Sequence, residues 1–260
     1  GLREVLDGTR CRTYPIDVDD DGLPPDLIPD ETDVLFTTVS HHCPTNATMP
    51  MERRKALLAK ARDKGFVIVE DDYEFEMAFG RSTSPALKSL DETGCVVYVG
   101  SFSKSLFPGL RLGYIVAPVA FVEEARLLRT RVLRHPPGLI QRTAAYFLSL
   151  GHYGAQINRM RKAYQRRRAE MTTAIAAHGL DIAGKVGDGG SSFWMKAPER
   201  IDTEDLARRL HKRGVIIEPG KLFFDPETAP NCHYRLAYSS IASAKIPDGI
   251  RLIADEIARS

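Results

Sequence analysis

Short apolar runs alternate with amphipathic segments along the first half of the chain. Met51–Lys64 has helical spacing, with Leu57, Leu58 and Ala61 on one face and Gly65 as a stop signal. Other runs are apolar along most of their length, as strands covered on both faces are. These predicted strands lie at residues 34–39, 66–70, 96–100 and 112–117. Strands that alternate with helices predict a mostly parallel sheet built from crossover units.

Two further segments precede this alternation. Residues 11–18 are predicted to form a strand, and residues 17–29 are rich in Asp, Pro and Gly, which is typical of a surface loop.

Helical periodicity dominates after Pro118. Helices are expected at residues 119–133, 138–150 and 153–177, and then the composition changes near Gly179. Short strands are expected at 192–196, 215–218 and 233–238, and helices at 203–213 and 246–259. The pattern predicts an α/β fold in which a large domain (1–150) with a mostly parallel sheet is joined by a linking helix (151–178) to a smaller α+β domain (179–260).

The composition is that of an ordinary soluble globular protein. Of 260 residues, 43% are hydrophobic and 27% are charged. The net charge of +2 gives no argument for nucleic-acid binding, and no apolar run is long enough to span a membrane. The four cysteines are scattered, which argues against a zinc site or a disulfide framework. With no visible secretion signal, the sequence predicts a protein of the reducing cytoplasm without a metal.

The most specific chemistry lies where a predicted strand runs into a lysine. The segment VVYVGSFSKSL covers residues 96–106 and places Lys104 just past a buried strand. Partial desolvation there lowers the pKa of a lysine and makes it a nucleophile for a carbonyl group. Ser101, Ser103 and Arg111 are placed to hold a phosphate, with Arg111 as a two-pronged donor.

A second predicted strand ends in acidic residues. Asp71 follows Glu70 at this strand end, and Tyr73 comes two positions later. A carboxylate there can pair with a protonated ring nitrogen, and a tyrosine hydroxyl can reach a phenolate oxygen, whereas Asp72 is expected to be a solvated or capping neighbour. A lysine Schiff base together with an aspartate opposite a pyridinium nitrogen is the signature of pyridoxal phosphate chemistry. Ligands of open α/β sheets gather at the carboxyl ends of strands, where these residues fall.

Four segments that stand in this order carry a resemblance to a known family. They are VIVEDDYEFEM, YVGSFSKSLFPGLRLGYIVAP, INRMRKAYQRRRAEM and HYRLAYSS, and Asp71 precedes Lys104 by 33 positions. The chain resembles the fold-type-I aminotransferases of the aspartate aminotransferase superfamily over nearly its whole length. Within that family it is most similar to the branch of the 2-aminoadipate-type aminotransferases and the aminotransferase-like halves of MocR-type regulators.

The resemblance implies pyridoxal 5′-phosphate as the cofactor. Lys104 resembles the lysine that forms the Schiff base, Asp71 the partner of the pyridine nitrogen, and Tyr73 the residue that bonds the ring hydroxyl. These three are the expected catalytic residues.

The remaining positions of the family's site also have counterparts in this sequence. Arg235 resembles the arginine that receives the α-carboxylate of the substrate, and it says nothing about the substrate's side chain. The residues that resemble the phosphate contacts are Ser101, Ser103 and Arg111.

The loop after the first predicted strand departs from the family pattern. Cys43 stands where the family has the asparagine that touches the ring hydroxyl, and Asn46 replaces a glycine. Asparagine tolerates the left-handed conformation, so the turn is expected to persist. Tyr73 or His42 is expected to supply the missing ring contact. The family's phosphate loop and its ring-stacking aromatic residue lie upstream of Gly1, so the chain is expected to lack an N-terminal part.

Two classes of function remain open. The first is an aminotransferase that moves an amino group between an amino acid and a 2-keto acid through Lys104, with another reaction of the same cofactor also possible. The second is the effector-binding domain of a MocR-type transcription regulator. A winged helix would distinguish them, and none is recognisable here, which favours the enzyme.

The partners expected of this segment are small molecules and a second copy of the chain. The resemblance implies a homodimer with sites at the interface. A basic run near residues 159–168 spreads its charges around a helix with an apolar stripe, which is typical of a solvated linking helix. This segment is therefore not expected to bind nucleic acid, and no membrane partner is expected.

Overall fold

The computed structural model describes residues 5–6, 8–78, 84–185, 189–225 and 227–260. Its first half is built on a four-stranded sheet, here called the N-terminal sheet, with strand order β1-β2-β3-β4. The strands are β1 (Val34–Thr37), β2 (Val67–Asp72), β3 (Val96–Ser101) and β4 (Gly113–Val116). The first three are parallel, and β4 runs antiparallel to β3. The carboxyl ends of β1, β2 and β3 therefore share one edge of the sheet.

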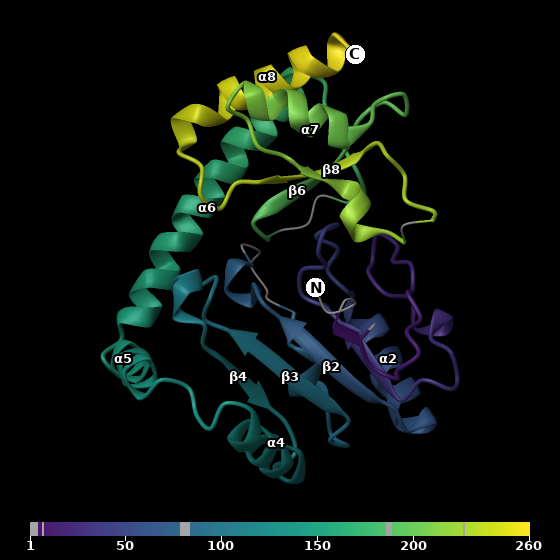
Figure 1. The fold of residues 1–260 in the computed structure, drawn as a ribbon, viewed down its shortest axis with the longest axis vertical. Helices are drawn as coiled ribbons and strands as arrows, with labels where there is room; N and C mark the ends of the chain where they lie inside the picture. Colours follow the sequence, from purple (N-terminus) through teal and green to yellow (C-terminus); the bar gives the residue numbers. More distant parts are fainter. Residues whose placement is uncertain (1–4, 7, 79–83, 186–188, 226) are drawn as a thin grey trace.

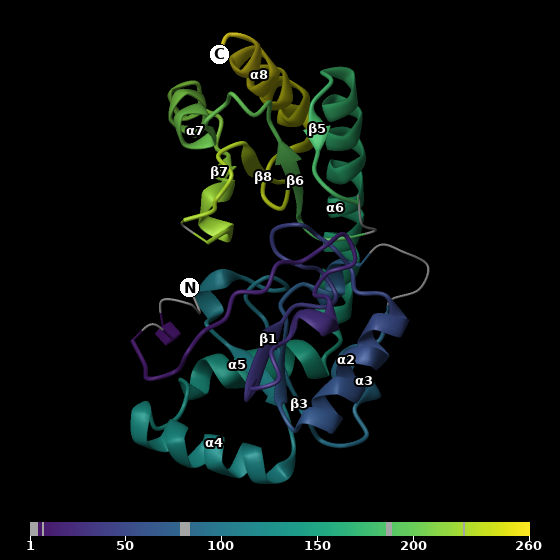
Figure 2. The same cartoon turned by 90° about the vertical axis from the view of Figure 1, so that its right-hand side faces the viewer.

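Helices lie on both sides of the N-terminal sheet. Figure 2 shows α2 (Met51–Lys64) and α3 (Leu87–Leu90) on one side, with α4 (Val119–Val132) and α5 (Gly138–Ser149) on the other. Leu57 of α2 and Leu87 of α3 pack against Ile68 in a core cluster. By contrast, α4 buries none of its residues within this chain.

A second sheet, here called the C-terminal sheet, has strand order β5-β6-β8-β7 and is antiparallel. Its strands are β5 (Asp181–Ile182), β6 (Ser192–Lys196), β7 (Glu218–Pro219) and β8 (His233–Ala237). The apolar face, with Phe193 and Leu236, packs against α6 (His152–Ala177) and α8 (Ile246–Ala258). The remaining helix, α7 (Thr203–Lys212), begins where the Asp202 carboxylate accepts the backbone N–H of Glu204 at 2.8 Å.

Helix α6 touches both halves of the chain. In Figure 1 it runs from the side of the N-terminal sheet up to the C-terminal sheet, which lies over the carboxyl ends of the parallel strands. Near its start the Tyr153 ring packs edge-on against Phe102, and the Arg161 guanidinium donates to the carbonyl of Glu76 at 2.6 Å. Further along, Met171 and Ile175 belong to the core beneath the C-terminal sheet. No helix among the described residues has the length and apolar character needed to cross a membrane.

The α/β fold with a mostly parallel sheet and a smaller α+β part is confirmed, whereas some elements differ from prediction. The strand predicted at residues 11–18 is wrong, because that segment is irregular and mostly exposed. Only Ile16 and Val18 pack on the core there. The strand expected at 215–218 is reduced to β7, and β5 was not predicted. The division of the chain into domains at residues 150 and 178 stays a prediction.

Arg54 of α2 is fully buried and holds three separate stretches of backbone. Its Nε donates to the carbonyl of Met49 at 2.8 Å, its Nη1 to that of Pro85 at 2.7 Å, and its Nη2 to that of Val39 at 3.0 Å. Burial lowers the pKa of Arg54, while the charges of Glu70 and Asp72 oppose that effect. One guanidinium thereby fixes the loop after β1 and the segment before α3.

Replacing Arg54 with methionine is expected to destabilise the fold strongly. Arg54→Met leaves the carbonyls of Met49 and Pro85 without their donor, at about 1–3 kcal/mol for each unsatisfied group, while the carbonyl of Val39 keeps only the backbone N–H of Met49. We expect the free energy of unfolding to fall by roughly 3 kcal/mol or more, measured by urea denaturation of the full-length protein.

Arg62→Met, on the same helix, is the matched control. Arg62 is exposed and contacts only its neighbour Asp63 in the described chain. A change within about 0.5 kcal/mol is expected for such a surface substitution. Equal effects of the two variants would contradict the role assigned to Arg54.

Candidate active site

Three chain segments meet at the carboxyl edge of the N-terminal sheet, facing the C-terminal sheet (Figure 1). The first is the loop that follows β1, with Ser40 to Asn46. The second is the end of β2, with Asp71, Tyr73 and Glu74, and the third is the turn after β3, with Lys104. The residues predicted from separate strand ends are thus brought to one edge.

The alternation of β2 divides its acidic residues between two faces. Asp72 points into the buried face, where its Oδ2 accepts the hydroxyls of Ser40 at 3.2 Å and Tyr98 at 3.4 Å. Burial raises the pKa of Asp72 to about 7. The expectation that Asp72 is a solvated or capping neighbour is therefore wrong.

Asp71 points to the opposite, open face of β2. Neighbouring atoms still exclude part of the water around its carboxyl, and this burial raises its pKa. Glu70, in contrast, is fully buried and accepts the backbone N–H groups of Leu87 at 2.8 Å and Lys88 at 2.9 Å. Asp71 is the carboxylate of this run that is free to meet a ligand.

Lys104 lies between Tyr73 and Glu74. Its Nζ is 3.7 Å from Oε1 of Glu74 and 6.0 Å from the centre of the Tyr73 ring, and 48% of its side chain is exposed. Glu74 is buried and accepts the hydroxyl of Ser191 at 2.5 Å. The ammonium is therefore held at the mouth of the site by a carboxylate that also contacts the chain leading into β6. The sequence analysis did not identify Glu74 as a site residue. The only feature of the sequence that points to it is its place in the acidic run after β2.

Tyr73 is fixed by the loop after β1. Its hydroxyl donates to the carbonyl of His41 at 3.3 Å. Burial raises the pKa of Tyr73 far above its ordinary value, so the phenol keeps its proton and remains a donor. Burial also raises the pKa of the nearby Cys43 thiol, which keeps that side chain neutral.

The turn around Asn46 forms as expected. Asn46 has a φ of 59°, and its side-chain amide donates to the carbonyl of Ser192 in β6. The His42 ring turns within its own loop, with Nδ1 2.9 Å from the hydroxyl of Thr45. Burial lowers the pKa of His42 to about 4. A ring contact from His42 to a cofactor stays a prediction.

The predicted phosphate contacts lie in one connection between β3 and β4. The Ser101 hydroxyl accepts the backbone N–H of Ser103 at 3.1 Å, which tightens the turn before Lys104. Arg111 is exposed and left-handed, with a φ of 48°. Two hydroxyls and a guanidinium thus sit on the same turn as the lysine, and their role in phosphate binding stays a prediction.

Arg235 reaches the site from the C-terminal sheet. On β8 it is directly opposite Glu218 of β7 on one side and Trp194 of β6 on the other. Its Nε donates to the Ser192 hydroxyl at 3.0 Å, and its Nη1 to Oε2 of Glu218 at 2.8 Å. Burial disfavours the charged form of Arg235 and so lowers its pKa. The hydrogen bond and charge of Glu218 outweigh this effect and hold the pKa of Arg235 above its ordinary value. Sequence reasoning missed Glu218, which was expected only as the last residue of a strand.

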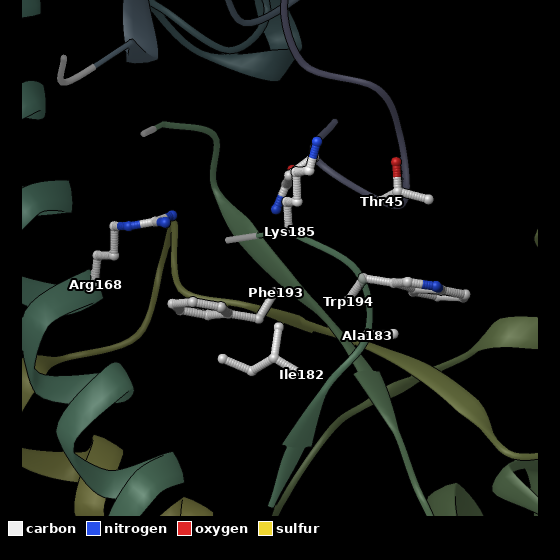
Figure 3. Close-up of a pocket in the computed structure, with 8 residues that line it drawn as sticks. Thr45, Arg168, Ile182, Ala183, Lys185, Phe193 and Trp194 are labelled. Atoms are coloured by element: carbon white, nitrogen blue, oxygen red, sulfur yellow. The ribbon is translucent and has the colours of Figure 1, made fainter. Parts of the chain in front are cut away.

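A small hollow lies beside this site, where the loop with Thr45 meets β6. Its volume is about 10 Å³, room for about one water molecule. Figure 3 shows Arg168 reaching toward it from α6, and the rings of Phe193 and Trp194 pointing away from each other on β6. It is far smaller than the roughly 300 Å³ or more that a small-molecule ligand needs. The group of side chains around Lys104, Tyr73 and Arg235 is therefore the better candidate, since Tyr73 and Arg235 lie within electrostatic reach of each other.

Comparisons with known proteins place this chain in a family. The chain matches the model of the aminotransferase class I and II family over residues 6–239. The chain therefore belongs to that family. Its predicted resemblance to the fold-type-I, pyridoxal-phosphate-dependent aminotransferases is confirmed.

Three relatives illustrate the range of similar proteins. The chain is 61% identical, over 98% of its length and 52% of the relative's, to the HTH-type transcriptional regulator TauR of Rhodobacter capsulatus. It is 29% identical, over 93% of its length and 60% of the relative's, to aromatic-amino-acid aminotransferase 1 of Thermococcus litoralis. Its structure is similar to LysN, the α-aminoadipate aminotransferase of Thermus thermophilus, with a TM-score of 0.87 and 27% identity over 95% of this chain and 66% of that one. The chain spans about half the length of the curated regulators it matches.

The partly buried imidazole of His42 is expected to make stability fall in acid. An imidazole has an ordinary pKa of 6.5, and burial in the fold lowers it to about 4. Below pH 6.5 the unfolded chain therefore binds a proton that the folded chain refuses, so stability falls as the pH drops from about 6.5 to about 4. The loss from this group is about 3 kcal/mol. His42→Gln is expected to remove that part of the slope in urea denaturation at a series of pH values.

Comparison of variant and wild type at each pH isolates this contribution. Asp72, with its pKa raised to about 7, acts in the opposite direction, but it is present in both proteins and cancels. His178→Gln, at an exposed position after α6, is the control and should keep the wild-type slope. A wild-type slope in His42→Gln would show that His42 is not kept neutral by the fold.

Proposed function

We propose that this chain is the pyridoxal-phosphate-binding, ligand-sensing domain of a MocR-type transcription regulator. The observation that carries the proposal is its 61% identity to the regulator TauR over 98% of the chain, against 29% to the T. litoralis aminotransferase. In this function the domain binds the cofactor and a carboxylate ligand in one cleft. Occupancy is then reported to a DNA-binding segment elsewhere in the protein.

The side chains at the strand ends fit the cofactor. Lys104 offers a half-exposed primary amine that can hold the cofactor covalently. Asp71 offers a carboxylate on the open face of β2 that can keep a ring nitrogen protonated, and Tyr73 offers a protonated phenol that can turn from the His41 carbonyl to the ring oxygen. The similar structure of LysN carries N-(5′-phosphopyridoxyl)-L-leucine, which supports this assignment.

The other predicted residues complete the site in this proposal. Ser101, Ser103 and Arg111 hold the phosphate, and Arg235 binds the carboxylate of the ligand. When bound, pyridoxal phosphate withdraws electrons from the ligand's α-carbon through its protonated ring. Lys104, once released, is placed to exchange a proton with that carbon.

An aminotransferase is the second candidate. The specific observation in its favour is that the lysine, the aspartate and the tyrosine of the family's chemistry are all present at one sheet edge. In that case the proton transfer by Lys104 leads to exchange of the amino group, and the substrates are an amino acid and a 2-keto acid. The sequence alone favoured this function, and the identity to TauR now favours the regulator.

We also propose a homodimer located in the cytoplasm. Helix α4 buries no residue within the chain and exposes apolar side chains, with Leu128 60% and Val132 72% exposed. Leu139 of α5 is 81% exposed. Apolar patches of this kind usually mark an interface, and a two-fold pair is the commonest closed arrangement. The cysteines are free thiols, as expected in a reducing compartment.

Lys104→Ala is expected to abolish covalent attachment of the cofactor. The full-length variant should lose the visible absorbance band of lysine-bound cofactor, and borohydride reduction should leave the cofactor removable by dialysis. Lys55→Ala is the control, because Lys55 is exposed on α2 and pairs only with Glu52 in the described chain. Cofactor that borohydride still fixes to the Lys104→Ala chain would refute the assignment of this lysine.

A paired assay separates the two candidate functions. The cofactor-loaded full-length protein is mixed with L-amino acids, and binding to the DNA upstream of its own gene is measured beside amino transfer to 2-oxoglutarate. For a regulator we expect DNA affinity to change by about 5- to 150-fold, with amino transfer no faster than for Lys104→Ala. Transfer at about 1 s⁻¹ or faster with unchanged DNA affinity would identify the enzyme instead.

A further inference from the structure

The guanidinium of Arg235 is already engaged before any ligand arrives. Its Nε is bonded to Ser192 and its Nη1 to Glu218. Within the described part of the chain, Nη2 makes no hydrogen bond. An arginine binds a carboxylate best through two parallel N–H groups. A ligand that approaches the end of this guanidinium therefore finds Nη2 available and shares Nη1, which carries two N–H groups, with Glu218.

Glu218 is the partner that can yield. Only 15% of the Arg235 side chain is exposed, and Ser192 holds it from the other side, whereas 43% of the Glu218 side chain is exposed. The Glu218 carboxylate can exchange the arginine for water, because its side chain is already partly solvated. A ligand carboxylate can thus replace Glu218 at Nη1.

Glu218 remains close to the ligand after it is displaced. Its backbone is fixed opposite Arg235 by the pairing of β7 with β8. The Cys43 thiol, in the loop after β1, lies within electrostatic reach of Arg235, Glu218 and Glu74. A ligand bound at Arg235 therefore lies beside the Glu218 carboxylate, which repels a second negative charge on that ligand.

We propose that Glu218 is a specificity-determining residue that acts through Arg235. It competes with the ligand for the guanidinium and selects ligands with a single carboxylate, neutral or cationic elsewhere, over dicarboxylates. This inference rests on the proposed role of Arg235 as the carboxylate-binding residue.

L-Glutamine and L-glutamate are the probes, because they differ by one charged group at nearly the same size. Isothermal titration of the cofactor-loaded full-length protein is expected to show weaker binding of L-glutamate than of L-glutamine. In Glu218→Gln we expect L-glutamine to bind several-fold more tightly, since the competing charge is gone. The preference against L-glutamate should shrink by several-fold, up to about tenfold.

Two further variants separate this role from a merely structural one. Glu218→Asp keeps the charge and should keep the preference for L-glutamine. Glu204→Gln removes a similarly exposed carboxylate of the same sheet's helices, which pairs with Lys221, and should leave both affinities unchanged. Weaker binding of both amino acids to Glu218→Gln would show that Glu218 only positions Arg235, and would overturn the proposal.

The remaining outcomes are also decisive. An unchanged affinity ratio in Glu218→Gln, with cofactor and probes bound normally, overturns the role of Glu218 and leaves the proposed function standing. If neither wild type nor Glu218→Gln binds either amino acid, freeing Arg235 creates no carboxylate site and the inference is wrong. Failure of the proposed function is detected by a different measurement: the wild-type protein would then lack the absorbance band of lysine-bound cofactor.

Discussion

The hydrogen bonds from the buried Arg54 guanidinium to three backbone carbonyls are the constraint on which the site depends. They join α2 to the loop after β1 and to the segment before α3, at the level where the parallel strands end. A guanidinium suits this task because its donors are fixed in one plane and it stays charged at every physiological pH. The loop that carries His41, Cys43 and Asn46 is therefore held at both of its ends by hydrogen bonds from one rigid guanidinium.

The acidic run at the end of β2 shows how one strand can serve several purposes. Because side chains alternate between faces, Glu70 and Asp72 enter the buried side, and Asp71 is left on the open side. The Glu70 carboxylate accepts backbone N–H groups at the start of α3, whereas the Asp72 carboxylate accepts side-chain hydroxyl groups. Strand geometry thus separates the structural carboxylates from the one on the open face, although all stand side by side in the sequence.

Much of the fold could be predicted from the sequence, because long periodic segments and buried apolar runs are local signals. Helix α2 was predicted to the residue, and the parallel strands were found with end errors of a few positions. The strand predicted at residues 11–18 failed because β-type composition forms a strand only beside a partner, and in the described chain none lies there. The two-residue strand β5 is too short to show any period.

The candidate site could be predicted only in part. Lys104, Asp71 and Tyr73 stand in contiguous motifs, so their placement at strand ends could be read directly. The contacts of Glu74 with Lys104 and Glu218 with Arg235 join positions that are distant in the chain, and each glutamate looks like a surface residue by itself. Such pairs are decided by the register of the sheets and the approach of the two sheets to each other.

The length of α6 has a mechanical consequence. Its 26 residues make a rod of about 39 Å, anchored beside Phe102 at one end and beneath the C-terminal sheet at the other. A rod of this length amplifies rotation: a tilt of about 5° at the sheet displaces the far end by about 3 Å. A small change in the angle between the two sheets would therefore strain the contact of Tyr153 with Phe102 at the start of α6.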